Sequence, residues 1–216
     1  MKTKSTFIGV LVFTFALVCS VASYGADLSP IQLPGPQMEG GKPLMQALKD
    51  RMTTRTFGEE KLPMQTLSNL LWAAFGINRP DGRRTAPSAK NWQEIDIYVA
   101  SPDGLFLWDP RKNVLNPIVG KDVRGLTGTQ PFVREAAVNL VYVADYSKAT
   151  GGGADKDVWV GADTGVIVEN VYLYCASEGL ATVVRANIDR DPLAKEMKLR
   201  PEQKITLAQS VGYPKK

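Results

Sequence analysis

The sequence predicts a mixed fold class in which helices and strands are interspersed along one domain. Apolar residues alternate with other residues at 95–100, which is typical of a strand, and the apolar segment at 160–178 is long enough to indicate a helix. About 190 residues remain after an N-terminal leader, and a chain of that size buries roughly 70% of its unfolded surface in one domain. We therefore expect a single core built from both kinds of element.

The first 23 residues have the features of a secretory signal peptide. Two lysines precede an apolar run at 7–18, and small residues follow the run at positions 20, 22 and 23. The run is shorter than the about 20 apolar residues of a membrane-spanning helix. We expect residues 1–23 to be removed and the mature protein to be soluble and exported, either periplasmic or secreted, without stable membrane insertion.

The cysteine content, the lack of histidine and the net charge each exclude some classes of function. Cys19 lies in the leader, where it leaves a lipid anchor as a less favoured alternative because Val18 is not a small residue. Cys175 is then alone, so no internal disulfide can form. The sequence has no histidine, which excludes Ser-His-Asp and Cys-His catalysis. Loss of Lys2 and Lys4 with the leader lowers the formal net charge from +4 to +2, which is too small to indicate nucleic-acid binding.

The first half of the chain is expected to begin with an arm and two helices. Residues 24–42 are rich in Pro and Gly and predict an extended arm in front of a domain at 43–216. Pro43 opens a short amphipathic helix, and a clearer helix runs from about Pro63 to Phe75. Gly76 is placed to end that second helix.

The second half is expected to contain the sheet. Strands at 95–100 and 104–110 flank a Pro-Asp-Gly turn and predict a hairpin, and the apolar run at 138–144 fits a strand covered on both faces. The helix at 160–178 is followed by Gly179 as its cap. A short strand at 181–184, a helix to 198 with Asp191 as its N-cap and Pro192 in its first turn, and a strand at 205–211 complete the domain.

Three separated segments carry short motifs of charged, small and amide residues. They are Arg51-Met52-Thr53-Thr54-Arg55-Thr56-Phe57, Pro87-Ser88-Ala89-Lys90-Asn91-Trp92-Gln93, and the long helix with Asn170 and Glu178-Gly179-Leu180 before a last strand and Gly212-Tyr213-Pro214. In order and spacing they resemble the FMN-dependent nitroreductase superfamily, whose first two motifs are Arg-x-Ser-x-Arg-x-Phe and Pro-Ser-x-x-Asn-x-Gln. The run at 71–89 is similar to the branch that contains the thiazoline and oxazoline dehydrogenases.

This resemblance implies an α+β sandwich, with a central and mostly antiparallel sheet flanked by helices, and an intertwined homodimer with FMN at its interface. Arg51 and Thr53 match positions that hold the FMN phosphate. Met52 lies between them near the ribityl chain, and Arg55 matches the basic residue at the pyrimidine edge of the flavin. Residues of the loop that reaches the other subunit's flavin are matched by Pro87, Ser88, Ala89 and Asn91.

The resemblance is incomplete at two places. Many relatives have Pro-x-Glu-Gly beside the reactive edge of the flavin, where this chain has Val184-Arg185-Ala186-Asn187. Ala186 and Asn187 are therefore placed at that edge, with the backbone N–H of Asn187 directed at flavin N5. The chain also ends at Lys216, short of a basic segment, so Lys215 is predicted to complete the phosphate site. No side chain is predicted to act as an acid, a base or a metal ligand.

The function implied is that of an exported FMN-dependent oxidoreductase. Flavin N5 would exchange a hydride with a small organic substrate, and the protein would supply binding and electrostatics. The electron donor is left open among NAD(P)H, a quinone and a redox protein. Two alternatives remain: a flavin-binding or carrier protein without turnover, and a non-catalytic dimeric scaffold.

Overall fold

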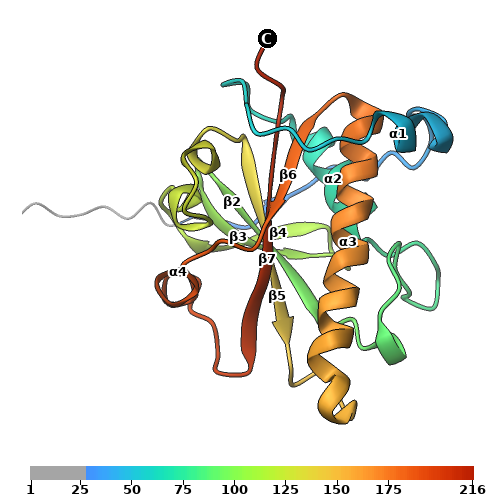
Figure 1. Cartoon of the computed structure of the whole chain (residues 1–216), viewed down its shortest axis with the longest axis vertical. Coiled ribbons are helices and arrows are strands. Elements are labelled where there is room, and N and C mark those ends of the chain that lie inside the picture. The colour runs from blue at the N-terminus through green and yellow to red at the C-terminus, as the bar shows by residue number, and fades with distance from the viewer. Residues whose placement is uncertain (1–27) are drawn as a thin grey trace, which may run out of the picture.

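The fold is organised around an antiparallel sheet, and the computed structural model describes residues 28–216 (Figure 1). Within these residues the sheet has seven strands in the order β1-β4-β3-β2-β5-β7-β6. Every neighbouring pair is antiparallel. The strands are β1 (Ile31–Gln32), β2 (Ile95–Ser101), β3 (Gly104–Asp109), β4 (Val114–Val119), β5 (Val138–Asp145), β6 (Ala181–Arg185) and β7 (Gln203–Gly212).

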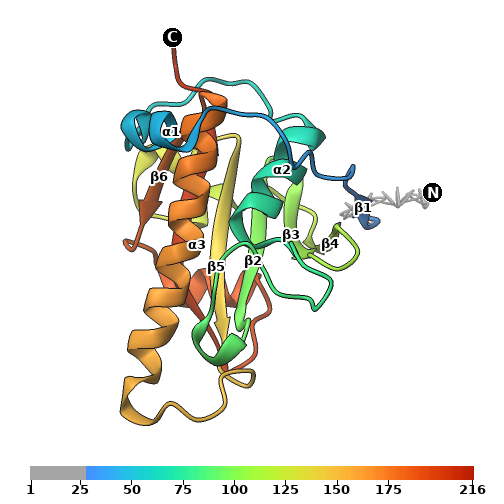
Figure 2. The ribbon, with the colours of Figure 1, turned by 90° about the vertical axis from the view of Figure 1, so that its right-hand side faces the viewer.

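Helices cover both faces of the sheet. They are α1 (Leu44–Asp50), α2 (Met64–Phe75), α3 (Lys156–Glu178) and α4 (Arg190–Glu196), with short 3-10 turns η1 (Ala89–Asn91), η2 (Arg124–Leu126), η3 (Pro131–Arg134) and η4 (Gly153–Asp155). α2 and α3 lie on one face and α4 lies on the other (Figure 1). α1 packs on α3 at the same end of the molecule as the C-terminus (Figure 2). The predicted α+β fold with an antiparallel sheet is confirmed.

β5 lies in the middle of the sheet and is buried on both faces, as its apolar run predicted. Leu140 and Tyr142 pack in the core beneath α2 and α3, whereas Val141 and Val143 pack in the core beneath α4. The two cores alternate along β5 because successive side chains of a strand point to opposite faces. The Tyr142 hydroxyl donates a hydrogen bond to Gln209 Oε1 at 2.7 Å, so the buried phenol has a partner.

Both ends of α2 and the C-terminal end of α3 agree with the sequence, whereas both ends of α4 do not. α2 follows Pro63 and ends at Gly76, and Gly179 closes α3 with a φ of 70° in the left-handed region. The prediction of Asp191 as the N-cap of α4 was wrong, because Asp189 holds that position. A proline is tolerated anywhere in the first turn, where backbone N–H groups have no partner inside the helix, so the helix starts two residues earlier. α4 also ends at Glu196 rather than at residue 198.

The arm and β4 pair with each other, which their local sequence patterns did not predict. The signal peptide predicted at 1–23, Cys19 and the first residues of the predicted arm lie outside the described residues. The described part of the arm is extended, and it pairs through Ile31 with Leu115 of β4. β4 was not predicted, since it contains Pro117. β1 pairs only with Val114 and Leu115, so Pro117 lies where β4 has no outer neighbour and loses no ladder hydrogen bond on that side.

None of the helices within residues 28–216 is both long enough and apolar enough to cross a lipid bilayer.

Candidate functional site

The first motif lies across the ends of β6 and β7. The Thr54 N–H donates to the Thr182 carbonyl at 3.0 Å, and the Gly58 N–H donates to the Tyr213 carbonyl at 2.9 Å. These bonds hold residues 51–58 in an extended course beside the C-terminal segment. The predicted phosphate-binding side chains therefore start from a fixed backbone.

Tyr172 of α3 connects this motif to β6. Its hydroxyl accepts the Val184 N–H at 3.0 Å and lies 3.0 Å from Thr53 Oγ1. The guanidinium carbon of Arg51 lies 5.4 Å from the centroid of the Tyr172 ring. When Tyr172 donates its single proton to Thr53, the Thr53 hydroxyl hydrogen is free to bind an anion. Tyr172 was not among the residues predicted for the site.

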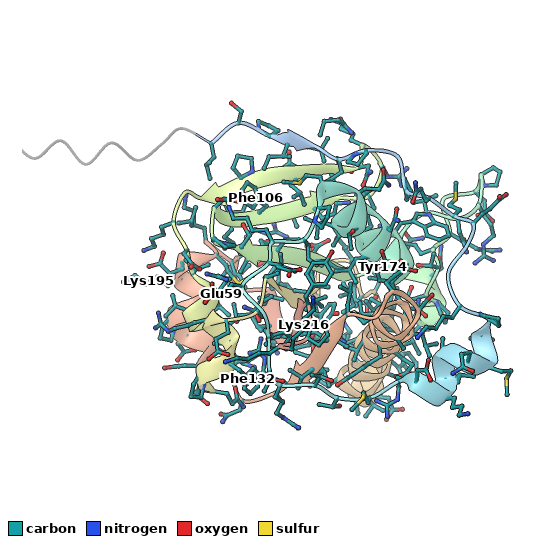
Figure 3. All side chains as sticks on the ribbon, turned by 90° about the horizontal axis from the view of Figure 1, so that it is seen from above. Glu59, Phe106, Phe132, Tyr174, Lys195 and Lys216 are labelled. Atoms are coloured by element: carbon teal, nitrogen blue, oxygen red, sulfur yellow. The ribbon has the colours of Figure 1, made fainter. Side chains whose placement is uncertain are left out.

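The other residues assigned to this region are exposed. Met52 is 65% exposed, and the side chain of Arg55 is also open to solvent. The Lys215 N–H reaches the Thr56 carbonyl at 3.4 Å, and its side chain lines an open hollow with Glu59 that does not include Arg51. Lys216 lies over this end of the molecule, between Glu59 and Tyr174 in Figure 3. A phosphate contact for Lys215 stays a prediction.

The loop at 87–93, called here the 87–93 loop, is fastened at two points. The Ser88 hydroxyl accepts the Gln93 N–H at 3.0 Å, and the Ala89 N–H donates to Asp163 Oδ2 of α3 at 2.8 Å. Ser88 and Ala89 are half-buried, whereas Pro87 is exposed. The anchor on Asp163 was not predicted, because no local pattern shows which residue of α3 meets the loop.

The backbone of the 87–93 loop is strained at three residues. Lys90, Asn91 and Gln93 have φ values of 50°, 56° and 50°, in the left-handed region. This region costs a non-glycine residue roughly 1 kcal/mol or more, so the surrounding bonds must hold the loop in shape. Trp92 packs against Trp159 of α3 with ring centroids 5.6 Å apart. Asn91 itself is exposed and available to a ligand.

One chain does not bring the two predicted cofactor segments together. The 87–93 loop contacts α3 at Asp163, and Thr53 contacts α3 at Tyr172. Asp163 and Tyr172 are nine positions apart in α3, which corresponds to about 13 Å along the helix axis and half a turn around it. The two segments therefore meet opposite sides of α3.

The segment after β6 is open to solvent and offers one backbone donor. Ala186 and Asn187 are both exposed. The Asn187 carbonyl accepts the Thr129 N–H at 3.3 Å, while its own N–H makes no hydrogen bond to any of residues 28–216. That N–H is free to donate to a ligand.

The preceding residue, Arg185, is directed into the protein. It is 4% exposed, donates to the Thr127 carbonyl, and reaches Asn139 Oδ1 at 2.8 Å. Burial lowers the pKa of Arg185 to about 10, so the guanidinium is still charged at neutral pH. Its contacts connect β6 to β5 and to the η2 turn, which gives it a structural role behind the exposed Ala186 and Asn187.

Comparison with known proteins identifies the family. The sequence pattern of the Nitroreductase family matches residues 48–213, which include the 51–57 and 87–93 motifs. The chain belongs to the nitroreductase family. It is 30% identical over 168 residues to a protein of Methanocaldococcus jannaschii named as a nitroreductase, an alignment that covers 73% of this chain and 83% of the relative.

Solved structures agree with this membership. A crystal structure from Ralstonia eutropha JMP134, described as a nitroreductase, is 40% identical to this nitroreductase-family chain, with a TM-score of 0.84 over 89% of this chain and 92% of the other. A Parabacteroides distasonis structure titled as an NADH dehydrogenase or NAD(P)H nitroreductase is 16% identical, with a TM-score of 0.58 over 80% and 88% of the chains, and it shares the fold. The protein is a nitroreductase-family oxidoreductase, and this family generally uses flavin cofactors.

For this nitroreductase-family protein, Tyr172→Phe is expected to weaken flavin binding about five- to tenfold. The change leaves the Val184 N–H without its acceptor and Thr53 without its partner, and a hydrogen bond of this kind contributes about 1 kcal/mol. Fluorescence titration with the flavin measures the effect. Tyr174→Phe is the matched control, because the Tyr174 hydroxyl donates to the Thr66 carbonyl of α2 at 3.4 Å and Tyr174 lies outside the 51–57 and 87–93 motifs. Equal affinities in both variants would contradict the role of Tyr172.

Proposed function

We propose that the protein is an FMN-dependent oxidoreductase that transfers a hydride between flavin N5 and a small organic substrate. The observation that carries the proposal is the placement of Arg51 and Thr53, both half-buried, against Tyr172. A phosphate with two negative charges needs charge-assisted donors when it leaves water, and a guanidinium supplies two parallel N–H groups. The family match supplies the flavin chemistry of the proposal.

Each residue assigned to the site binds or orients the cofactor in this proposal. Arg51 and Thr53 hold the phosphate, and the backbone of Met52 follows the ribityl chain. Arg55 lies at the pyrimidine edge, where a cation stabilises negative charge on a reduced ring. The free N–H of Asn187 donates at the reactive edge. The bound flavin supplies hydride transfer, so no side chain has to act as an acid or base.

We also propose a homodimer in which each 87–93 loop reaches the flavin of the other subunit. The apolar side chains of α1 are turned outward, with Leu44, Met45 and Leu48 exposed by 63%, 76% and 46%. Nearer its N-terminal end, α3 presents an exposed face of small residues that includes Gly161 and Gly165. Apolar surface of this kind marks an interaction site, and small residues let two helices approach closely. A two-chain site also accounts for the separation of the two segments along α3.

We propose the substrate and the electron donor only by chemical class. The run at 71–89 favours the heterocycle dehydrogenase branch, but Lys90–Gln93 departs from that branch, so we propose only a small organic molecule. The name of the P. distasonis neighbour makes NAD(P)H the first donor to test, with a quinone or a redox protein after it. Export is proposed from the leader at 1–23, and N-terminal sequencing of the mature protein tests it.

Replacement of Arg51 by alanine is expected to raise the FMN dissociation constant roughly ten- to a hundredfold, because a charged hydrogen bond is worth about 1.5–3 kcal/mol. Ser88→Ala should weaken binding as well, since Ser88 closes the 87–93 loop on Gln93. Arg111→Ala, an exposed arginine in the turn after β3, is the control. FMN affinity that is unchanged in both site variants would show that the mapping is wrong.

Turnover separates the enzyme from the alternatives. An enzyme should purify yellow, or take up FMN to one per subunit, and should lose flavin absorbance under anaerobic NAD(P)H or another donor. A carrier protein would bind FMN and not be reduced by any donor. A dimeric scaffold would bind no FMN at all.

A further inference from the structure

Glu94 carries a carboxyl group that is buried next to the 87–93 loop. It follows Gln93 and precedes β2, and it is 0% exposed. Its backbone is fixed, since the Glu94 carbonyl accepts the Asp145 N–H at 2.9 Å. Neither side-chain oxygen of Glu94 has a hydrogen-bond donor among residues 28–216. Such a group is costly to bury as an anion.

The neighbour of Glu94 is the loop anchor on α3. Asp163 is a neighbouring carboxyl group whose charge acts on Glu94, and it also accepts the Ala89 N–H at 2.8 Å. Two carboxyl groups bond to each other only when one carries a proton. With a proton on Glu94, its O–H donates to Asp163, and Asp163 keeps its bond to the loop. The pair then has no unpartnered charge.

We propose that Glu94 and Asp163 form a proton-sharing pair that positions the 87–93 loop for the flavin. The proposal rests on the proposed function, in which this loop contacts FMN. The loop needs such an anchor because Lys90, Asn91 and Gln93 are held in the left-handed region. The bond from Ala89 to Asp163 ties this strained backbone to α3, in addition to the packing of Trp92 on Trp159.

The charges around the pair set the direction of its pH dependence. Burial, and then the charge of Asp163, raise the pKa of Glu94 to about 7. Lys148, after β5, favours the anion but is itself bound to Asp96 at 2.7 Å. Tyr146 also faces this region, and its hydroxyl donates to Asp157 at 2.6 Å.

The loop is therefore anchored below about pH 7 and loosened above it. Above that pH Glu94 loses its proton, and two negative charges face each other in a buried site. The native state holds this proton more tightly than the unfolded chain does. The stabilising contribution is complete below the unfolded pKa of Glu94 and is lost as the pH rises through about 7.

Two readouts test the pair, and one of them needs no flavin. The emission of Trp92 and Trp159, which pack together, reports the state of the loop in the flavin-free protein, and Trp92→Phe assigns that signal. FMN titrations across the same pH range report its effect on the cofactor. Wild type should show a change in emission centred near pH 7, with FMN affinity about five- to tenfold lower on the alkaline side.

Glu94→Gln is the decisive variant. Its amide donates to Asp163 without titrating, so it should keep the loop anchored, remove the midpoint and give an FMN affinity that does not fall above pH 7. Asp163→Ala should loosen the loop at every pH and lower FMN affinity about five- to tenfold at low pH. Glu135→Gln, at an exposed glutamate, is the control and should behave as wild type.

The outcomes separate the pair from the proposed function. An emission midpoint that persists in Glu94→Gln, or that is missing in wild type, overturns the pair even when FMN binds tightly. If wild type binds no FMN at any pH, the proposed function fails and the flavin role of the pair fails with it. An emission midpoint that Glu94→Gln abolishes would then still show that the two carboxyl groups share a proton and hold the loop.

Discussion

Replacing Gly165 with arginine is expected to convert the proposed dimer to monomers and to lower FMN affinity by roughly a hundredfold or more. Gly165 is exposed on α3 in the single chain, and among residues 28–216 a side-chain carbon added there meets no atom outside its own stretch of helix within 4 Å. The subunit should therefore still fold, and the charge should act only where a second copy packs against α3. Because one chain holds the 51–55 segment and the 87–93 loop on opposite sides of α3, a monomer would have an incomplete site under the proposed two-chain arrangement.

Light scattering and FMN titration on the same sample check this result. Gly35→Arg is the matched control, since an added side-chain carbon at Gly35 also meets nothing within 4 Å and the residue lies on the arm. The control should remain dimeric and bind FMN. A Gly165→Arg monomer that binds FMN as wild type would contradict a site built from two chains. A variant that stays dimeric would contradict packing through this face of α3.

The parts of the fold that were predictable are those with a strong local signal. α2 carries apolar residues at helical spacing between Pro63 and Gly76, and β5 is an uninterrupted apolar run. β4 was missed because its stability comes from pairing with β3 and β1, and its proline argues locally against a strand. The start of α4 was misplaced because either aspartate before Pro192 is an acceptable N-cap.

The site was predictable only where its residues form a motif in sequence. Arg51 and Ser88 were assigned in this way, and their roles in cofactor binding stay predictions. Tyr172, Glu94 and Asp163 were not, because their roles arise from contacts between distant segments. The buried residues of α3 form one stripe at helical spacing from Val160 to Cys175, and periodicity shows which residues are covered but not which partner covers them. Glu94 precedes the alternating residues of β2, and nothing local distinguishes it from a surface glutamate.

Leu70→Ala is expected to lower the free energy of unfolding by about 2–5 kcal/mol, the usual cost of removing a large buried side chain together with the cavity that remains. Leu70 lies in α2, is 0% exposed, and belongs to the core between α2, α3 and the sheet. Met64→Ala, in the same helix at 46% exposure, should change stability by only about 0.5 kcal/mol. Urea unfolding at one fixed protein concentration compares the variants, since dimer stability depends on concentration.

The same variant distinguishes support of the fold from contact with the cofactor. Leu70 is an apolar core residue that lies outside both the 51–55 segment and the 87–93 loop. α2 is joined to the residues just before that loop by bonds such as the one from Thr85 Oγ1 to the Trp72 carbonyl at 3.1 Å. FMN affinity should therefore be unchanged in folded Leu70→Ala. Saturating FMN should then add the same increment to the unfolding free energy of variant and wild type, because that increment depends only on ligand concentration and dissociation constant. A smaller increment in Leu70→Ala would mean that the core beneath α2 sets the geometry of the cofactor site, and not only the stability of the domain that carries it.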